Sequence, residues 1–289
     1  MINLGVQFPT EELGIDAGAI RDFIQGAEAL GYGHVVAGEH VVGSDPASKA
    51  GRETRYTNEA LFHEPLTLFA YLAACTKEML LISTVLILPM RQTVLVAKQA
   101  AEVDCLSGGR LRLGIGVGRN PIEYEALRQD FHTRGRRVEE QVALLRELWT
   151  KPVVTFEGRW EKITEAGLNP LPVQRPIPIW FGGTTEAVLK RTARLADGWI
   201  PTGAMGTGNF DDSLAQMHGY LRDAGREPSA LAIAGRADAG KGTPDEWRKT
   251  YADWQRWGAT TLAVDVSAPG VTTPEQMLNT LRQYKEAIS

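Results

Sequence analysis

The sequence has little cysteine, no long apolar run and no excess of positive charge, and each shortage excludes a class of protein. Its two cysteines, Cys75 and Cys105, lack the paired spacing of a metal knuckle or a disulfide framework, so we expect a reduced, cytoplasmic protein without a metal site. The formal net charge of -4 argues against nucleic-acid binding, which needs a basic surface. No stretch of about 18 apolar residues occurs and residues 1–5 do not open an export signal, so neither a membrane span nor secretion is expected.

What the chain does contain is a regular alternation of two patterns, in 289 residues of which 43% are hydrophobic. Short β-branched or aliphatic runs alternate with longer segments whose apolar residues recur at helical spacing, as in successive βα units. The expected strands are residues 2–8, 34–38, 80–88, 111–117, 177–182, 198–201, 231–235 and 260–264. The matching helical patterns are residues 17–30, 66–76, 94–106, 136–149, 186–195, 210–224, 244–257 and 274–288.

This alternation predicts an α/β fold, a single (β/α)8 TIM barrel over residues 1–289 with insertions after strands 2 and 4. A doubly wound open sheet gives the same alternation, but so many repeated units in one chain of this length favour closure. Residues 39–64 and 150–176 exceed the usual connection length, and both are candidate walls of a substrate pocket. Trp160 and Trp180 are candidate lining residues, although aromatic side chains at such positions more often pack.

In a barrel of this kind the chemistry lies where the strands end, and the second strand ends in Gly38-Glu39-His40. A histidine there can donate to a cofactor or move a proton at neutral pH. The alternative is an ordinary surface histidine beside a carboxylate. The apolar run from Ser83 to Arg91 suits a buried parallel strand, so core packing alone explains it.

Two glycine-containing segments also follow strands. Glycines alternate along residues 114–118, which removes side chains where a flat ring must approach, although the order is not that of a dinucleotide fingerprint. Residues 179–185 run from a strand through glycines and threonines into a helix, an arrangement suited to a phosphate or to a plain helix cap. Glu186 in the first helical turn counts against the phosphate. Residues 107–109 read as a helix C-cap.

Together these segments resemble the luciferase-like monooxygenase (bacterial-luciferase-like) superfamily over essentially the whole chain. The segments that carry the resemblance are Gly38-Glu39-His40, Thr84-Val85, Leu88-Pro89-Met90-Arg91, Leu106-Ser107-Gly108-Gly109-Arg110, Gly114-Ile115-Gly116-Val117-Gly118, Arg134-Gly135-Arg136, Ile179-Trp180-Phe181-Gly182-Gly183 and Ala196-Asp197-Gly198-Trp199. The form is most similar to members that use the deazaflavin coenzyme F420, and FMN-dependent members share much of the pattern.

The resemblance implies that His40 lies beside the isoalloxazine ring and is the catalytic residue. Glu39, where many members carry aspartate, is expected to help bind the cofactor. Thr84 and Val85 match a bulge in the third strand, where a non-proline cis peptide bond supports the ring from behind. The cofactor-binding glycines and hydroxyl are expected to be Gly116, Gly118, Gly182, Gly183 and Thr184, of which the last three match the family's phosphate loop.

One departure bears on the substrate. Sugar-phosphate dehydrogenases of this family carry a glutamate directly after the Gly-x-Gly of the fourth strand, where this chain has Arg119. Glu123 matches a second acidic position of the family, which does not by itself identify a proton donor. Arg110 and Arg134 can be site residues or surface charge, and Lys190 and Arg191 are candidates for a basic path along the F420 tail.

The function implied is hydride transfer between F420 and a small organic substrate. The alternative is an FMN-dependent, two-component monooxygenase that uses oxygen and takes reduced flavin from a partner reductase; a third is a flavin-binding protein without activity. A homodimer is expected from the resemblance. The sequence assigns no substrate.

Overall fold

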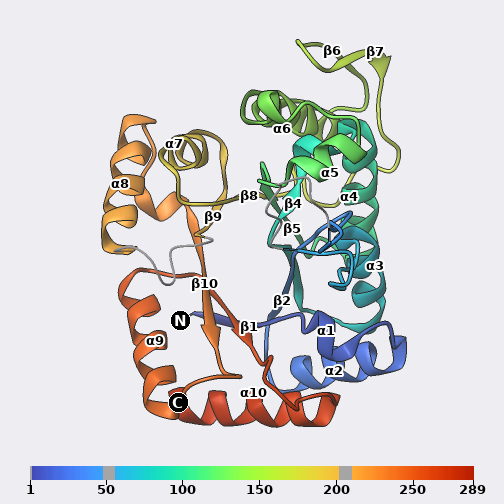
Figure 1. Ribbon diagram of the computed structural model, residues 1–289. Helices are drawn as coiled ribbons and strands as arrows, with labels where there is room; N and C mark the ends of the chain where they lie inside the picture. The colour runs from blue at the N-terminus through green and yellow to red at the C-terminus, as the bar shows by residue number, and fades with distance from the viewer. Residues whose placement is uncertain (1, 48–55, 202–209) are drawn as a thin grey trace.

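Eight parallel strands close into a barrel in the computed structural model, which describes residues 2–47, 56–201 and 210–289 (Figure 1). They are β1 (Asn3–Gln7), β2 (His34–Ala37), β3 (Leu80–Ser83), β5 (Leu111–Gly116), β8 (Ile179–Gly182), β9 (Gly198–Ile200), β10 (Ala232–Asp238) and β11 (Thr261–Asp265). The first and last of them pair with each other, Asn3 beside Thr261, so the sheet returns on itself. The predicted closed barrel is confirmed, and the open sheet is excluded.

Helices cover the outside of the barrel, as the predicted alternation requires (Figure 1). The long ones are α2 (Ala17–Ala29), α3 (Pro65–Cys75), α4 (Thr93–Ser107), α6 (Arg134–Thr150), α7 (Glu186–Leu195), α8 (Phe210–Asp223), α9 (Pro244–Arg256) and α10 (Pro274–Ile288). The short ones are α1 (Thr10–Leu13), α5 (Pro121–Ala126) and the 3-10 turns η1 (Leu88–Met90), η2 (Phe131–Thr133) and η3 (Pro228–Ala230). Among the helices of the described residues, none has the length and hydropathy to cross a bilayer. Helix α4 ends at Gly108 in the left-handed conformation, as the C-cap interpretation predicted.

The interior of the barrel is filled by side chains from several strands. Val36, Ile82, Trp180, Ile200 and Ala263 form one cluster, separate from the larger core between sheet and helices. The Trp180 ring takes the space that a side chain at position 198 would need, since a Cβ there would lie 2.4 Å from the ring. Trp180 is therefore packing, as the alternative to a pocket role predicted.

The third strand was predicted as one continuous run over residues 80–88, but the structure divides it into two pieces. It is broken after Ser83: the Thr84–Val85 peptide bond is cis, a short strand β4 (Leu86–Ile87) pairs with β5, and η1 follows. The break falls at Ser83 and Thr84, the two hydroxyl residues of an otherwise apolar stretch, and the pieces on both sides of it are buried. The cis bond that the family resemblance implied is confirmed.

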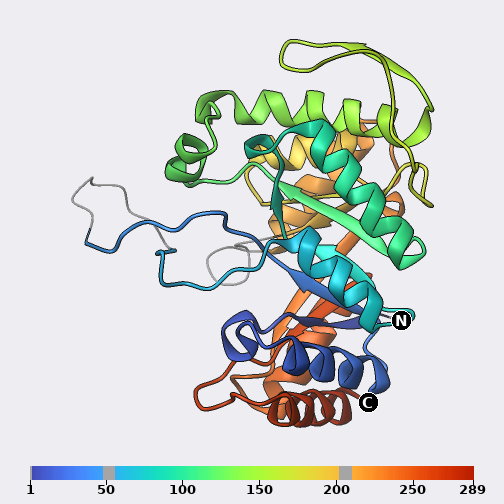
Figure 2. The same cartoon turned by 90° about the vertical axis from the view of Figure 1, so that its right-hand side faces the viewer.

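The two long connections take different places. The segment after β2 projects from the barrel end at which the strands finish (Figure 2), and its stem is closed by a bridge between Ser44 and Thr57. The segment before β8 forms an antiparallel hairpin of β6 (Val154–Glu157) and β7 (Lys162–Ala166). Only the first connection contributes to the cavities beside His40 that are described below.

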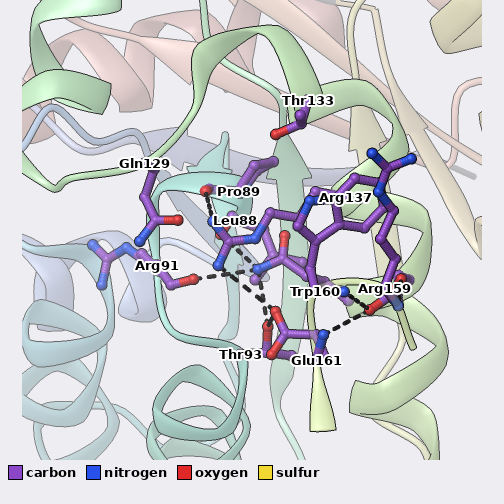
Figure 3. Close-up of polar contacts among 12 residues, drawn as sticks. Leu88, Pro89, Arg91, Thr93, Gln129, Thr133, Arg137, Arg159, Trp160 and Glu161 are labelled. Carbon is purple, nitrogen blue, oxygen red and sulfur yellow. Dashed lines mark hydrogen bonds and ion pairs between the residues drawn. The ribbon is translucent and has the colours of Figure 1, made fainter. Parts of the chain in front are cut away.

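The hairpin is fastened to the outer side of α4 and α6. Glu140 of α6 accepts hydrogen bonds from the backbone N–H groups of Arg159, Trp160 and Glu161. The Glu161 carboxylate in turn accepts from the Thr93 hydroxyl at 2.7 Å (Figure 3). Trp160 thus sits at the tip of a hairpin that packs on the outside of the barrel helices, which accounts for it without a pocket role.

The end at which the strands begin is closed by buried polar groups. Arg110 is 9% exposed and donates to the carbonyl oxygens of Ala73, Met79 and Ser107, so surface charge is the wrong interpretation of this residue. His34 is 1% exposed, and burial lowers its pKa to about 3.

Candidate active site

The break in the third strand places Val85 between two glycines of neighbouring strands. A Cβ at Gly116 would lie 2.6 Å from Val85 Cγ2, and a Cβ at Gly182 would lie 2.6 Å from Val85 Cγ1. Any side chain at either glycine would therefore displace Val85. Three residues predicted separately from the sequence thus meet at the carboxyl end of the barrel, where they form an apolar surface suited to the face of a flat ring.

His40 follows β2 and is paired with a carboxylate that comes from another part of the chain. Its Nδ1 lies 3.1 Å from Oε2 of Glu123, and the other oxygen, Oε1, accepts from the backbone N–H of Val41 at 2.8 Å. The Glu123 side chain is 3% exposed and that of His40 is 19% exposed. The pair can hold and move a proton, since the histidine reaches solvent and the carboxylate does not.

Glu123 is the site residue that sequence reasoning did not assign. Its helix α5 is capped by Asn120, whose side chain accepts from the Ile122 N–H, and begins with Pro121. Asparagine followed by proline is a helix-start signal, and it could have placed Glu123 in a first turn. Arg119, by contrast, is exposed, so the acidic group beside His40 comes from α5 and not from the end of the fourth barrel strand.

The segment after β2 folds over the imidazole ring. The ring of Tyr56 lies 3.9 Å from that of His40 between centroids, and the ring of Phe62 lies 4.8 Å away in an edge-on arrangement. His40 also lines two cavities, of about 490 and 340 Å³. The larger one is lined by apolar side chains such as Met90 and Leu127 together with polar ones such as Gln129, so a small organic molecule could lie beside the histidine.

Glu39 is buried, and its two oxygens have protein partners. One accepts from the backbone N–H of Ile87, and the other is paired with Arg91, which also contacts Glu64 at 2.9 Å. Burial raises the pKa of the Glu39 carboxyl, and Arg91 opposes that rise. These contacts hold the end of β2 against the broken third strand, which favours a structural role for Glu39 over direct cofactor binding.

Gly118 lies at the turn that leads to α5, with φ +62°. A Cβ there would meet Ile87 Cγ2 at 2.8 Å, whereas Gly116 faces Val85. Gly118 therefore serves the chain reversal that brings Glu123 to His40, and it is Gly116 that leaves room at the apolar surface.

The predicted phosphate loop is partly used by the protein itself. The Gly183 N–H donates to Ile200 O, and the Gly183 carbonyl accepts from Trp199 Nε1. For the N–H groups of Thr184 and Thr185, which precede α7, no acceptor is found within the described residues. These two donors at the start of a helix are the part of the loop that remains available to an anion.

The charges beyond this loop are paired. Lys190 donates to Glu186 and lowers the pKa of that exposed carboxyl, which weakens the expected repulsion of an anion at the helix start. Arg191 is 7% exposed and joins α7 to α6 through Glu139. Arg191 therefore connects two helices and does not provide a basic path. The guanidinium of Arg134, the other arginine considered from the sequence, lies over the Phe131 ring.

The chain belongs to the luciferase-like monooxygenase family, because the sequence model of that family matches residues 2–239. An uncharacterised protein of Mycobacterium tuberculosis is 37% identical over 165 residues, which make up 57% of this chain and 56% of that one. An FMNH2-dependent dimethylsulfone monooxygenase of Pseudomonas putida is 31% identical over 145 residues (49% and 40%). An F420-dependent glucose-6-phosphate dehydrogenase of Gordonia bronchialis is 32% identical over 160 residues (53% and 47%). The chain spans about half the length of the curated relatives it matches.

Solved structures share the fold along the whole chain. The monooxygenase RslO1 from Streptomyces bottropensis has a TM-score of 0.78 at 22% identity, covering 99% of this chain and 98% of that one. An F420-dependent secondary alcohol dehydrogenase has a TM-score of 0.78 at 16% identity, with both chains covered completely at 100%. The similar proteins thus include both F420- and FMN-dependent oxidoreductases on one scaffold.

Proposed function

We propose that this protein is an oxidoreductase that transfers a hydride between coenzyme F420 and a small organic substrate. The observation that carries the proposal is the position of Val85 between Gly116 and Gly182, beside His40, which follows the neighbouring strand β2 and is paired with Glu123 of α5. The apolar surface of Val85 beside two glycines suits the face of an isoalloxazine-type ring, and a partly exposed histidine suits the transfer of a proton.

The residues of this chain divide the work as follows. Val85 would support the ring from behind, and the N–H groups of Thr184 and Thr185, which have no acceptor among the described residues, would donate hydrogen bonds to the cofactor phosphate. A bound deazaflavin supplies a carbon that accepts or returns a hydride. His40 takes up the proton that the substrate loses in the same oxidation, and the adjoining cavity leaves room for that substrate beside the imidazole.

A second candidate is an FMN-dependent monooxygenase served by a partner reductase. The similarity to an FMNH2-dependent monooxygenase favours it, and the apolar surface of Val85 suits either ring. The two functions differ in the cofactor that binds and in the need for oxygen, so cofactor affinity separates them.

The test is a fluorescence titration of the purified protein with oxidised F420 and, in parallel, with FMN at matched salt. Tight binding of F420 with weak binding of FMN supports the proposal. The reverse order replaces it with the monooxygenase. Binding of neither cofactor contradicts both functions. For the variant Gly182→Ala, which is discussed below, Gly219→Ala is the matched control, because a Cβ at this helix position meets nothing within 4 Å.

A further inference from the structure

The buried carboxylate of Glu123 lies behind His40 and has two contacts, in both of which it acts as a hydrogen-bond acceptor. Glu123 Oε1 accepts from the Val41 N–H, and a backbone N–H can only donate. Oε2 lies 3.1 Å from His40 Nδ1. As a carboxylate Glu123 can only accept, so the hydrogen in this second contact belongs to Nδ1. A neutral imidazole then has its lone pair on Nε2.

The surroundings hold the ring in this arrangement. Tyr56 and Phe62 contact the imidazole from the segment after β2, while Glu123 holds it from α5. The Glu123 side chain is 3% exposed, so water competes little for either oxygen. The imidazole is thereby fixed by two ring contacts and one hydrogen bond.

We propose that Glu123 is the positioning residue that sets His40 in its Nδ1–H tautomer, so that Nε2 is the atom that accepts the substrate proton. This inference rests on the proposed function for the identity of the reaction, and on the geometry alone for the tautomer. As the substrate gives up a hydride to the oxidised cofactor, its proton passes to Nε2. The imidazolium that results carries hydrogens on both nitrogens and remains paired with the Glu123 carboxylate.

The substitution Glu123→Gln tests this because an amide has only one acceptor oxygen. If that oxygen keeps the Val41 N–H, the amide NH2 faces Nδ1 of His40, and Nδ1 must become an acceptor. The hydrogen then moves to Nε2. A shape-conserving change is therefore expected to invert the tautomer without removing either contact.

The measurement is a long-range 1H–15N spectrum of histidine-labelled protein at a pH where the imidazoles are neutral, with His40 assigned by its loss in His40→Gln. The unaltered protein should show His40 as Nδ1–H, and Glu123→Gln should show it as Nε2–H. His63 is an internal reference, since its Nε2 lies 3.0 Å from the Gly14 carbonyl oxygen and must carry hydrogen. Glu64→Gln is the matched control, because Glu64 lines the same cavity as His40 and has no contact with its ring.

An Nε2–H signal for His40 in the unaltered protein, or an unchanged signal in Glu123→Gln, overturns the proposal. A second readout is turnover with the cofactor that the titration selects. Glu123→Gln and His40→Gln should each lower kcat, and the double variant should lower it no further than His40→Gln alone. Additive losses would contradict the positioning role. Because the spectrum requires no cofactor, failure to bind F420 or FMN would overturn the proposed function separately.

Discussion

One histidine opens strand β2 and another follows it at the opposite end of the barrel, and the two have opposite surroundings. His34 opens the strand, is 1% exposed, and has its Nδ1 3.0 Å from Asn3 Oδ1. His40 follows the strand, is paired with a buried carboxylate, and lines a cavity of about 490 Å³. One residue type thus serves as an uncharged packing group at the closed end and as a candidate proton carrier at the open end.

The comparison extends to the neighbours of the two histidines. At the closed end Arg110 donates hydrogen bonds to carbonyl oxygens of three different segments, and these bonds connect helix ends with strand starts. At the open end, Gly116 and Gly182 leave the space that Val85 partly fills. At the closed end, the polar groups of Arg110 form hydrogen bonds within the protein. At the open end, the N–H groups of Thr184 and Thr185 have no acceptor among the described residues and can bind a ligand, as expected for this type of barrel.

The largest effect should come from removing the histidine at the open end. His40→Ala is expected to lower kcat about 10²–10⁴-fold, because a positioned proton carrier contributes about that factor. Folding should be intact, since the side chain already borders a cavity. Steady-state kinetics and circular dichroism make the test, with exposed His132→Ala as the matched control. Unchanged kinetics together with unchanged cofactor affinity would remove His40 from the site.

The fold was largely predictable from the sequence because the alternation of strands and helices determines it. The eight barrel strands were predicted near their observed positions, and so was the cis bond at Thr84–Val85, although that came from family resemblance. The residue pattern alone predicted one continuous strand over residues 80–88, and only the family resemblance indicated the bulge at Thr84 and Val85. The two halves of the strand are both buried, and burial rather than periodicity dictates their composition.

The candidate site was predictable only in part. Val85, Gly116 and Gly182 were singled out next to strand ends and do lie together, since the barrel brings those ends together, and their role in cofactor binding stays a prediction. Glu123 was noted without a role, because its contact with His40 spans 83 positions of sequence and depends on a short helix. Glu39 was expected to bind the cofactor, but its partners, Arg91 and the Ile87 N–H, lie beyond the break in the third strand. Neither partnership leaves a local signal in the sequence.

The histidine at the closed end should affect stability and its dependence on pH. The folded His34 has a pKa of about 3 against 6.5 when exposed, so below pH 6.5 the unfolded chain takes up a proton that the folded chain does not. Stability from this group is therefore complete above pH 6.5 and is lost as the pH falls. At pH 5 the loss is about 2 kcal/mol, from about 1.4 kcal/mol for each pH unit.

The measurement is urea unfolding at pH 7 and pH 5 for the unaltered protein and for His34→Gln. The variant should lose less free energy of unfolding between the two pH values, whatever its absolute stability. The exposed His132 again supplies the control, since His132→Gln should leave the pH dependence as it was. If His34→Gln loses as much free energy of unfolding between pH 7 and pH 5 as the unaltered protein, His34 is not held uncharged. The proposed contrast between the two histidines would then be wrong.

The smallest effect concerns the space at the open end, and a second substitution can reverse it. Gly182→Ala adds a Cβ 2.6 Å from Val85 Cγ1, so Val85 must shift, and overpacking of this kind costs about 1–3 kcal/mol. We expect the affinity for the bound cofactor to fall about tenfold, which corresponds to about 1.4 kcal/mol. Val85→Ala in the same chain removes both Cγ atoms and should restore much of the affinity. If Gly182→Ala binds normally, or if the double variant is as weak as the single one, Val85 is not the surface on which the ring rests.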